Sequence, residues 1–360
     1  MIDDAIHRVL ELARWAPSGD NTQPWRFEIA GERQVVVHGH DTREHCVYDL
    51  HGRASQLSIG ALLESIALAA STEGWACSVS RRTGLPETRP TFDVEFAIDS
   101  AIRPDPLATA LPRRSVQRRP LSRRPLSIDE KRALEAAAGP GFRLQWLDGP
   151  GQRGRAARLM FRSARIRLTT PEAFAVHHAI IEWDARNSID RVPDQALGAD
   201  ALSLKLMRFA MASWQRVHFF NRFLAGTWLP RLQLDLMPAL ACGAHFVIHA
   251  AAPAVSIDEH VAAGRAVQRV WLTATTLGLW QQPEMTPLIF SEYARLGTPF
   301  STRAGALAEA AQVRERLARL FGTDPRSAVW MGRLGAGAGP TARSLRRPLE
   351  ELLLPASPTG

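Results

Sequence analysis

A loop of small polar residues near the N-terminus carries groups that can bind a heteroaromatic ring. The chain runs Ala-Pro-Ser-Gly-Asp-Asn-Thr-Gln-Pro-Trp from Ala16 to Trp25. Pro17 ends the preceding helix pattern, so the loop exposes backbone amides beside hydroxyl and amide side chains. These groups can hydrogen-bond the polar edge of a ring, and Trp25 can form an apolar wall. The alternative is an ordinary polar loop in which Asp20 or Asn21 supports a turn.

A run of arginines in the middle of the chain is a candidate anion site. Residues 112–120 read Pro-Arg-Arg-Ser-Val-Gln-Arg-Arg-Pro, and a capping box, with Ser127 as N-cap and Glu130 at N3, opens the next helix. Guanidinium groups bind phosphate through paired hydrogen bonds, so this segment can clamp a phosphorylated ligand. A solvated basic linker is the alternative.

Two further segments carry weaker signals. Residues 281–285, Gln-Gln-Pro-Glu-Met, follow a long apolar helix pattern. Residues 340–348 form an arginine-rich stretch near the C-terminus, for which a frayed basic tail is the alternative.

The first loop resembles the Ala-Pro-Ser-x-x-Asn-x-Gln-Pro-Trp signature of the nitroreductase superfamily, and it matches that signature without gaps. The resemblance implies a nitroreductase-like fold and an FMN cofactor. It also implies that the loop contacts the flavin ring through four residues: Pro17, Ser18, Asn21 and Gln23.

The arginine run resembles the family's Arg-x-Ser-x-Arg/Lys motif, which grips the FMN phosphate and ribityl chain. The match is imperfect in both registers: starting at Arg113 it leaves Gln117 in place of a base, and starting at Arg114 it puts Val116 at the serine position. The register with Arg114 and Arg118 is favoured. In the family, a loop after the second long helix and a basic tail complete the site. The resemblance therefore places FMN contacts at these residues: Arg113, Arg114, Ser115, Arg118, Pro283, Glu284, Arg343, Arg346 and Arg347.

Hydrophobic periodicity predicts the elements that position these segments. Helices are expected at residues 3–15, 55–74, 127–138, 254–277 and 304–321. Strands are expected at residues 27–29, 34–37, 78–80, 92–96, 142–146 and 244–250. Together they predict an α+β fold in which mixed or antiparallel sheets are flanked by helices.

An internal repeat divides the chain into two unequal halves. With a constant offset of 204, residues 60–75 match residues 264–279 at five positions, and both segments predict a buried helix that ends at a glycine. Chance similarity of two Ala/Leu-rich helices is the alternative. The repeat predicts an N-terminal half, residues 1–105, and a C-terminal half, residues 106–360, with a helical insert at about 155–240. The motifs then give one complete FMN site per chain, so a monomer or a homodimer is expected.

Composition excludes several classes of protein. The net charge of +8 comes almost entirely from arginine, since Lys131 and Lys205 are the only lysines. No zinc finger or basic helix accompanies this charge, so no nucleic-acid partner is expected. Neither a leader nor an apolar run of roughly 18–20 residues was found, and three unpaired cysteines fit a reducing compartment. We therefore expect a cytoplasmic protein with no membrane partner and no metal.

The resemblance implies an NAD(P)H-dependent oxidoreductase that acts on an unknown small-molecule acceptor. FMN supplies the redox chemistry of such enzymes, so no protein acid or base is obligatory and no catalytic residue is predicted. The aromatic-rich insert supports an alternative. The fused halves with one site also resemble Acg-type flavin-sequestering proteins, in which a lid covers FMN and storage replaces catalysis.

Overall fold

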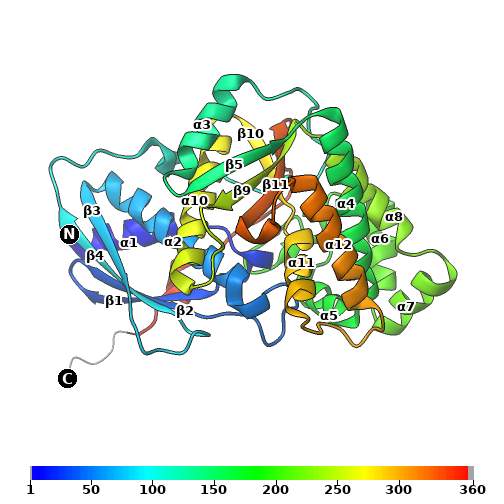
Figure 1. Ribbon diagram of the computed structural model, residues 1–360. Helices are drawn as coiled ribbons and strands as arrows, with labels where there is room; N and C mark the ends of the chain where they lie inside the picture. The colour runs from blue at the N-terminus through cyan, green and yellow to red at the C-terminus, as the bar shows by residue number, and fades with distance from the viewer. Residues whose placement is uncertain (1, 356–360) are drawn as a thin grey trace.

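Two four-stranded antiparallel sheets organise the chain, and helices cover them (Figure 1). The computed structural model describes residues 2–355. Residue 1 of the first expected half and residues 356–360 of the second therefore lie outside the described residues. The strands of the first sheet are β1 (Trp25–Gly31), β2 (Gln34–Gly39), β3 (Trp75–Arg81) and β4 (Thr91–Ile98). Those of the second sheet are β5 (Phe142–Leu147), β9 (Ala244–Ala250), β10 (Leu279–Pro283) and β11 (Ala328–Ala336). This architecture confirms the predicted α+β class.

The two sheets have the same connectivity. The first is built in the order α1 (Ile2–Ala13), β1, β2, α2 (Arg53–Thr72), β3 and β4. The second is built in the order α3 (Ile128–Ala138), β5, β9, α10 (Ile257–Thr276), β10 and β11. When the elements are matched in this order, the strand sequence β1-β2-β4-β3 of the first sheet corresponds to β5-β9-β11-β10 of the second.

Helices α2 and α10 cross at the centre of the molecule. Each has 20 residues, and their bounds keep the offset of 204 seen in the sequence. They meet at two glycines: a Cβ atom on Gly60 would lie 2.1 Å from the carbonyl oxygen of Val261, and one on Gly264 would lie 2.1 Å from that of Leu57. The contact is reciprocal, because Leu57 and Gly60 occupy the same places in α2 as Val261 and Gly264 in α10.

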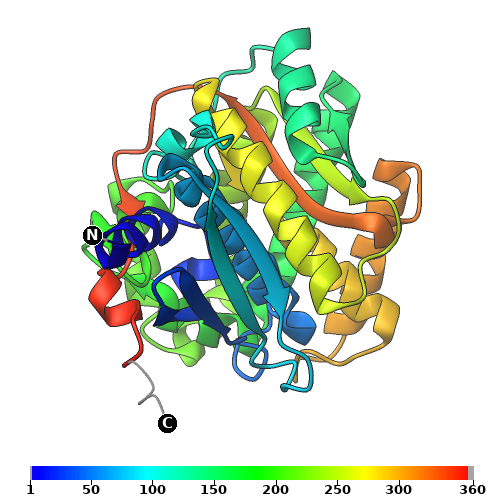
Figure 2. The ribbon, with the colours of Figure 1, turned by 90° about the vertical axis from the view of Figure 1, so that its left-hand side faces the viewer.

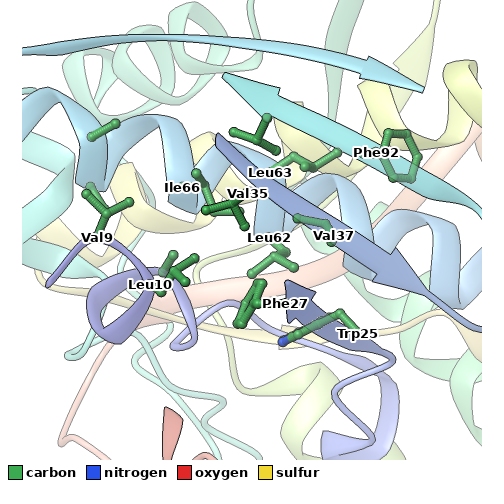
Figure 3. Packing of buried hydrophobic residues seen from close by; sticks show 14 of the residues in the cluster. Val9, Leu10, Trp25, Phe27, Val35, Val37, Leu62, Leu63, Ile66 and Phe92 are labelled. Atoms are coloured by element: carbon green, nitrogen blue, oxygen red, sulfur yellow. The ribbon is translucent and has the colours of Figure 1, made fainter. Parts of the chain in front are cut away.

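One face of the first sheet packs on α1 and α2. Figure 3 shows Leu10 of α1, Phe27 and Val37 of the sheet, and Leu62 and Leu63 of α2, all fully buried. Helix α2 contacts the sheet on one side and α10 on another, which explains why its sequence is apolar nearly all round. The segment Leu50–Thr72 has the length and composition of a membrane span, contrary to expectation, but 78% of its apolar window is buried inside the fold. It is therefore a core helix.

The insert between β5 and β9 is mostly helical, as predicted. Its elements are α4 (Pro150–Thr169), α5 (Pro171–Ile180), α6 (Ala201–Ala210), α7 (Trp214–Phe223), α8 (Trp228–Pro230), a π-helical segment (Arg231–Leu236) and α9 (Met237–Leu240). Three two-residue strands, β6 (Ile181–Glu182), β7 (Asn187–Ser188) and β8 (Val192–Pro193), lie between α5 and α6. Figure 1 shows α6, α7 and α8 at the edge of the molecule far from the first sheet.

The C-terminal segment returns to the first sheet. After α11 (Thr286–Leu296), α12 (Ala306–Phe321) and β11, the chain forms β12 (Arg343–Ser344) and α13 (Leu349–Leu352). Figure 2 shows this last helix beside α1. Leu349 and Leu352 are buried in the core of the first sheet, and the Leu354 amide donates to the Phe27 carbonyl at 2.7 Å. The basic tail is therefore anchored rather than frayed.

Candidate functional site

A cavity of about 960 Å³ lies where the first loop, the arginine segment, the C-terminal segment and the insert meet. Nine of the thirteen predicted site residues line it: Pro17, Ser18, Asn21, Arg114, Ser115, Arg118, Pro283, Arg343 and Arg346. Segments far apart in the sequence are thus brought to one cavity. The other four predicted residues are Gln23, Arg113, Glu284 and Arg347, which do not line it.

The first loop has an unusual backbone. Asp20, Asn21 and Gln23 all have left-handed φ values, of 50°, 63° and 49° respectively. Residues other than glycine rarely adopt this conformation, and they do so where surrounding contacts impose it. The loop therefore presents its groups to the cavity in a conformation that its neighbours must hold in place.

Gln23 supplies much of that support. Its side chain is fully buried, its Nε2 donates to the Ile189 carbonyl at 2.9 Å, and its Oε1 accepts from the Arg347 amide at 2.9 Å. Gln23 was predicted to contact the flavin, and in this structure its side-chain amide joins the loop to the insert and the C-terminal segment. Arg347 points outward to Asp190 at 2.6 Å.

Three arginines gather around the C-terminal end of α1. Arg114 Nη2 donates to the Trp15 carbonyl at 3.1 Å, and Arg346 Nε donates to the Ala16 carbonyl at 2.8 Å. The Arg343 guanidinium lies over the Trp15 ring, 5.2 Å from its centroid. Arg114 and Arg346 are buried, whereas Arg343 is half-buried. We refer to Arg114, Arg343 and Arg346 as the arginine cluster.

The arginine cluster has no acidic partner among residues 2–355. Burial lowers the pKa of all three side chains, and repulsion from neighbouring guanidinium groups adds to this for Arg114 and for Arg346, whose pKa falls to about 9. The buried Nε atoms of Arg114 and Arg343 also lack a hydrogen-bond partner within the described chain. The helix end supplies partial negative charge but no full compensating charge. The cluster is therefore suited to an anion that brings its own acceptors.

The neighbouring predicted residues have different environments. Arg113 is exposed, and its Nε donates to the Thr109 carbonyl at 3.1 Å, so the register that begins at Arg113 does not point its first arginine into the cavity. Arg118 lines the cavity near Asp20. Burial raises the pKa of Asp20 while Arg118 opposes that rise, and burial lowers the pKa of Arg118 while Asp20 opposes that fall. Asp20 and Arg118 therefore form a second charged group in the cavity wall, and their partners differ from those of the arginine cluster.

Arg333 of β11 holds the arginine segment in place, a role that sequence reasoning missed. Its guanidinium is buried and donates to the carbonyl oxygens of Arg118 at 2.7 Å and Arg119 at 3.3 Å. The Gln117 amide donates to the Gln281 carbonyl of β10 at 3.0 Å. The segment is thus fixed along the second sheet and is not a mobile linker.

The segment 281–285 is only partly a loop. Residues 281–283 belong to β10, where Pro283 still lines the cavity. The Glu284 amide donates to the Met331 carbonyl at 2.8 Å, and its carboxylate lies 2.7 Å from His245 Nδ1. Glu284 was predicted to contact FMN, and in this structure its amide and its side chain both bond to strands of the second sheet.

Tyr48 of the first half and three residues of the insert contribute polar groups that the sequence did not reveal. Tyr48 Oη lies 3.1 Å from His177 Nε2, and the two rings stack with centroids 5.6 Å apart. Arg167 pairs with Asp235 at 2.7 Å. All four side chains line the cavity. Burial, reinforced by Arg167, lowers the pKa of His177 to about 3, so its ring is neutral at neutral pH.

Comparison with known proteins gives distant relatives. No family model matches the chain. An "Uncharacterized protein" of Mycobacterium tuberculosis is 26% identical over 294 residues, which is 80% of this chain and 39% of that protein. Two M. tuberculosis proteins named "Putative NAD(P)H nitroreductase" are 31% identical over 120 residues, which is 32% of this chain and 34% of each of them. The chain thus aligns with less than half the length of these relatives.

Two solved structures share a weak likeness with the fold. A nitroreductase-like family protein from Bacillus cereus is 12% identical, with a TM-score of 0.35 over 69% of this chain and 95% of that one. A Desulfovibrio desulfuricans protein, described as a "putative nitroreductase" in complex with FMN, is 17% identical, with a TM-score of 0.32 over 70% and 98%. Because these structural likenesses are weak, they support no further argument, and the sequence matches show that about a third of this chain is similar to two proteins named as putative nitroreductases.

Proposed function

We propose that this protein binds one FMN in the cavity and acts as an NAD(P)H-dependent oxidoreductase on a small acceptor. The observation that carries the proposal is the arginine cluster, three cationic side chains without an acidic partner at the edge of a large cavity that the first loop also lines. Two of the matched M. tuberculosis proteins are named "Putative NAD(P)H nitroreductase", which supports the same chemistry.

The residues present fit a flavin phosphate. A phosphate group would accept from the unpaired Nε atoms of Arg114 and Arg343, and its negative charge would offset the repulsion that lowers the pKa of the arginines. Ser115 adds a hydroxyl to the same wall. The alternative is that the arginines serve only to cap α1. That role accounts for the bonds to the Trp15 and Ala16 carbonyls but leaves two buried Nε atoms unused.

The chain's own groups would bind and orient the cofactor, while FMN when bound supplies the transfer of hydride and electrons. Ser18 and the strained backbone around Asp20 face the cavity and can contact a ring edge. The insert forms another wall of the cavity. Because one chain contributes both the first loop and the arginine cluster, the site does not need a second subunit.

We further infer that the two halves arose by internal duplication and form a pseudo-dimer. The matched strand order of the two sheets and the reciprocal contact of Gly60 with Gly264 support this inference, since each contact across a two-fold interface occurs twice, once in each symmetry-related position. Only the second half carries the arginine segment, which gives one site per chain.

Anaerobic reduction tests the oxidoreductase proposal. Purified protein loaded with FMN is mixed with NADH or NADPH, and the flavin absorbance band is followed. Bleaching with either donor is expected. If the protein retains FMN but neither donor bleaches it, the oxidoreductase proposal fails. A flavin-sequestering role would then be the remaining alternative. If the protein takes up no FMN at all, both fail.

A further inference from the structure

The cavity has the volume of a large small-molecule site. Its volume of about 960 Å³ lies at the upper end of the roughly 300–1,000 Å³ typical of single small-molecule sites. The arginine cluster and the first loop line part of it. The helices α4, α5, α6 and α7 of the insert line another part, which we call the apolar chamber, and its main residues are Met160, Ile180, Met207, Met211, Val217 and Phe220.

The apolar chamber offers no uncompensated charge. Arg167 and Asp235, the charged side chains that the insert contributes there, pair with each other at 2.7 Å. Gln233 donates to Asp200 at 2.5 Å, and the Asn221 amide donates to the Leu168 carbonyl at 2.7 Å. A charged ligand would lose its hydration here without gaining a partner, which is costly. The chamber therefore favours an uncharged molecule.

One polar pair in the chamber retains hydrogen-bonding capacity. In the contact between Tyr48 Oη and His177 Nε2, only one of the two groups donates. If the histidine donates, the tyrosine O–H is free to donate to a ligand carbonyl. If the tyrosine donates, its oxygen can still accept from a ligand hydroxyl. Either tautomer leaves one hydrogen bond for a neutral polar group.

We propose that the apolar chamber binds an uncharged, largely apolar molecule with one carbonyl or hydroxyl group, which Tyr48 and His177 position. This inference rests on the proposed function in one respect: with FMN bound beside the arginine cluster, a carbonyl compound in the chamber would be the electron acceptor, its carbonyl taking up a hydride and a proton to become a hydroxyl group, whereas a hydroxyl compound would only occupy the chamber. The binding itself depends only on the chamber.

Calorimetry with two matched probes tests the charge preference. The probes are 2-acetylnaphthalene, a neutral aromatic ketone, and 2-naphthoate, which carries a carboxylate on the same ring system. The FMN-loaded protein is expected to bind the ketone at least about tenfold more tightly than the carboxylate, because the carboxylate would be desolvated without a partner. Equal or tighter binding of 2-naphthoate would overturn the proposal.

Two substitutions on the same helix locate the binding. Met207→Glu places a charge in the chamber and should weaken ketone binding about tenfold or more. Leu202→Glu is the matched control, because Leu202 lies on α6, is 77% exposed and does not line the cavity. It should leave binding unchanged. Equal weakening by the two variants would show that the ketone binds the outer apolar surface instead, and would overturn the proposal.

A third variant tests the polar pair, and the flavin absorbance separates the two hypotheses. Tyr48→Phe keeps the ring and should weaken ketone binding about threefold to tenfold, the usual value of one hydrogen bond. Unchanged affinity would remove Tyr48 from the site. Bound FMN should stay the same in all three variants. A protein that holds FMN but not the ketone refutes the chamber alone. A protein that holds the ketone with this variant pattern but takes up no FMN supports the chamber and refutes the FMN site.

Discussion

Arg113 and Arg114 are adjacent in sequence, but their surroundings differ completely. Arg114 is buried beside the Trp271 ring, with its guanidinium 4.6 Å from the ring centroid, whereas Arg113 reaches out to the Thr109 carbonyl. A buried guanidinium without an acidic partner destabilises the folded protein, and a bound anion would offset that destabilisation. This contrast between neighbours offers a direct experiment on the site.

Replacing Arg114 and Arg343 together by glutamine should weaken FMN binding by about tenfold to a hundredfold, the value of one or two hydrogen bonds to a charged group. Flavin fluorescence titration of the apo protein measures the dissociation constant. The control, Arg113→Gln, removes the same charge from an exposed neighbouring position and should change the constant by less than about twofold. Equal effects of the two changes would mean that the arginines act through general charge and do not clamp a phosphate.

The sequence predicted which residues line the cavity more accurately than it predicted what their side chains contact. The four segments picked out in the sequence led to nine residues that line the cavity, because each motif lies on one continuous segment. Gln23 and Glu284 belong to the same motifs but point elsewhere, and a motif does not record side-chain direction. Tyr48 and His177 are 129 positions apart in the chain. No local pattern could join them, since α5 meets the first half only in the folded structure.

Within the second sheet, β9 contains two buried histidines whose pKa values are shifted in opposite directions. His245 lies between the Ala239 carbonyl and the Glu284 carboxylate; burial would lower its pKa, but Glu284 raises it to about 10. His249 bonds the neutral Ser327 and Gln145 side chains, and burial lowers its pKa to about 4. His245 is therefore charged in the folded protein at neutral pH, and His249 is not.

This difference predicts a pH dependence of stability. A histidine whose pKa is raised on folding stabilises the protein fully below its unfolded value of 6.5, and that contribution is lost as the pH rises towards 10. Between pH 7 and 9.5, His245 should lower the free energy of unfolding by up to about 1.4 kcal/mol per pH unit. Urea unfolding across this range measures the slope. His245→Gln should flatten the slope, and the control His249→Gln should leave it unchanged. The same slope in wild type and His245→Gln would show that His245 is neutral.

The principal helices and most strands could be predicted because their apolar patterns are local. The capping box at Ser127 is present as expected, and each of the two long helices is followed by a left-handed glycine, Gly74 and Gly278. Strand β11 was not foreseen. Its sequence, Ala-Val-Trp-Met-Gly-Arg-Leu-Gly-Ala, contains two glycines and a buried arginine, and its pairing with β9 and β10 is non-local. Strand β11 therefore forms because it pairs with strands that are distant in sequence, which no local pattern records.

The crossing of α2 and α10 is the contact on which the two halves depend. Because the helix backbones touch at Gly60 and Gly264, no side chain fits between them. Gly60→Ala and Gly264→Ala should each destabilise the protein by about 1–3 kcal/mol through overpacking, and by similar amounts because their surroundings are equivalent. Thermal or urea unfolding measures the loss.

Gly154→Ala is the matched control for these changes. Gly154 also lies inside a helix, α4, but a Cβ there would meet nothing within 4 Å. This substitution should stabilise the protein by about 0.5–1 kcal/mol, since alanine favours the helix. A destabilisation of the same size in all three variants would mean that helix glycines are generally required here and that the crossing has no special role.

The two halves share a strand order, but only one set of site elements serves the cavity. The first loop comes from the first half, and the arginine segment, the insert and the C-terminal segment come from the second. In a symmetric pair, an equivalent cavity would lie across the two-fold axis. It would need a second arginine segment, and residues 4–105 contain no counterpart of residues 112–120. A two-fold arrangement with unequal halves therefore predicts one FMN site per chain.

The protein should bind one FMN per chain of 39.7 kDa, whether it is a monomer or a homodimer in solution. Flavin absorbance against protein concentration gives the ratio, and light scattering after gel filtration gives the mass of the same sample. A ratio near one for a monomeric species would show that a single chain completes the site. A ratio near one half in a dimer would mean that two chains share each FMN, and the pseudo-dimer would then be incomplete. A ratio near two would require a second anion site, and the arginine cluster could not supply both.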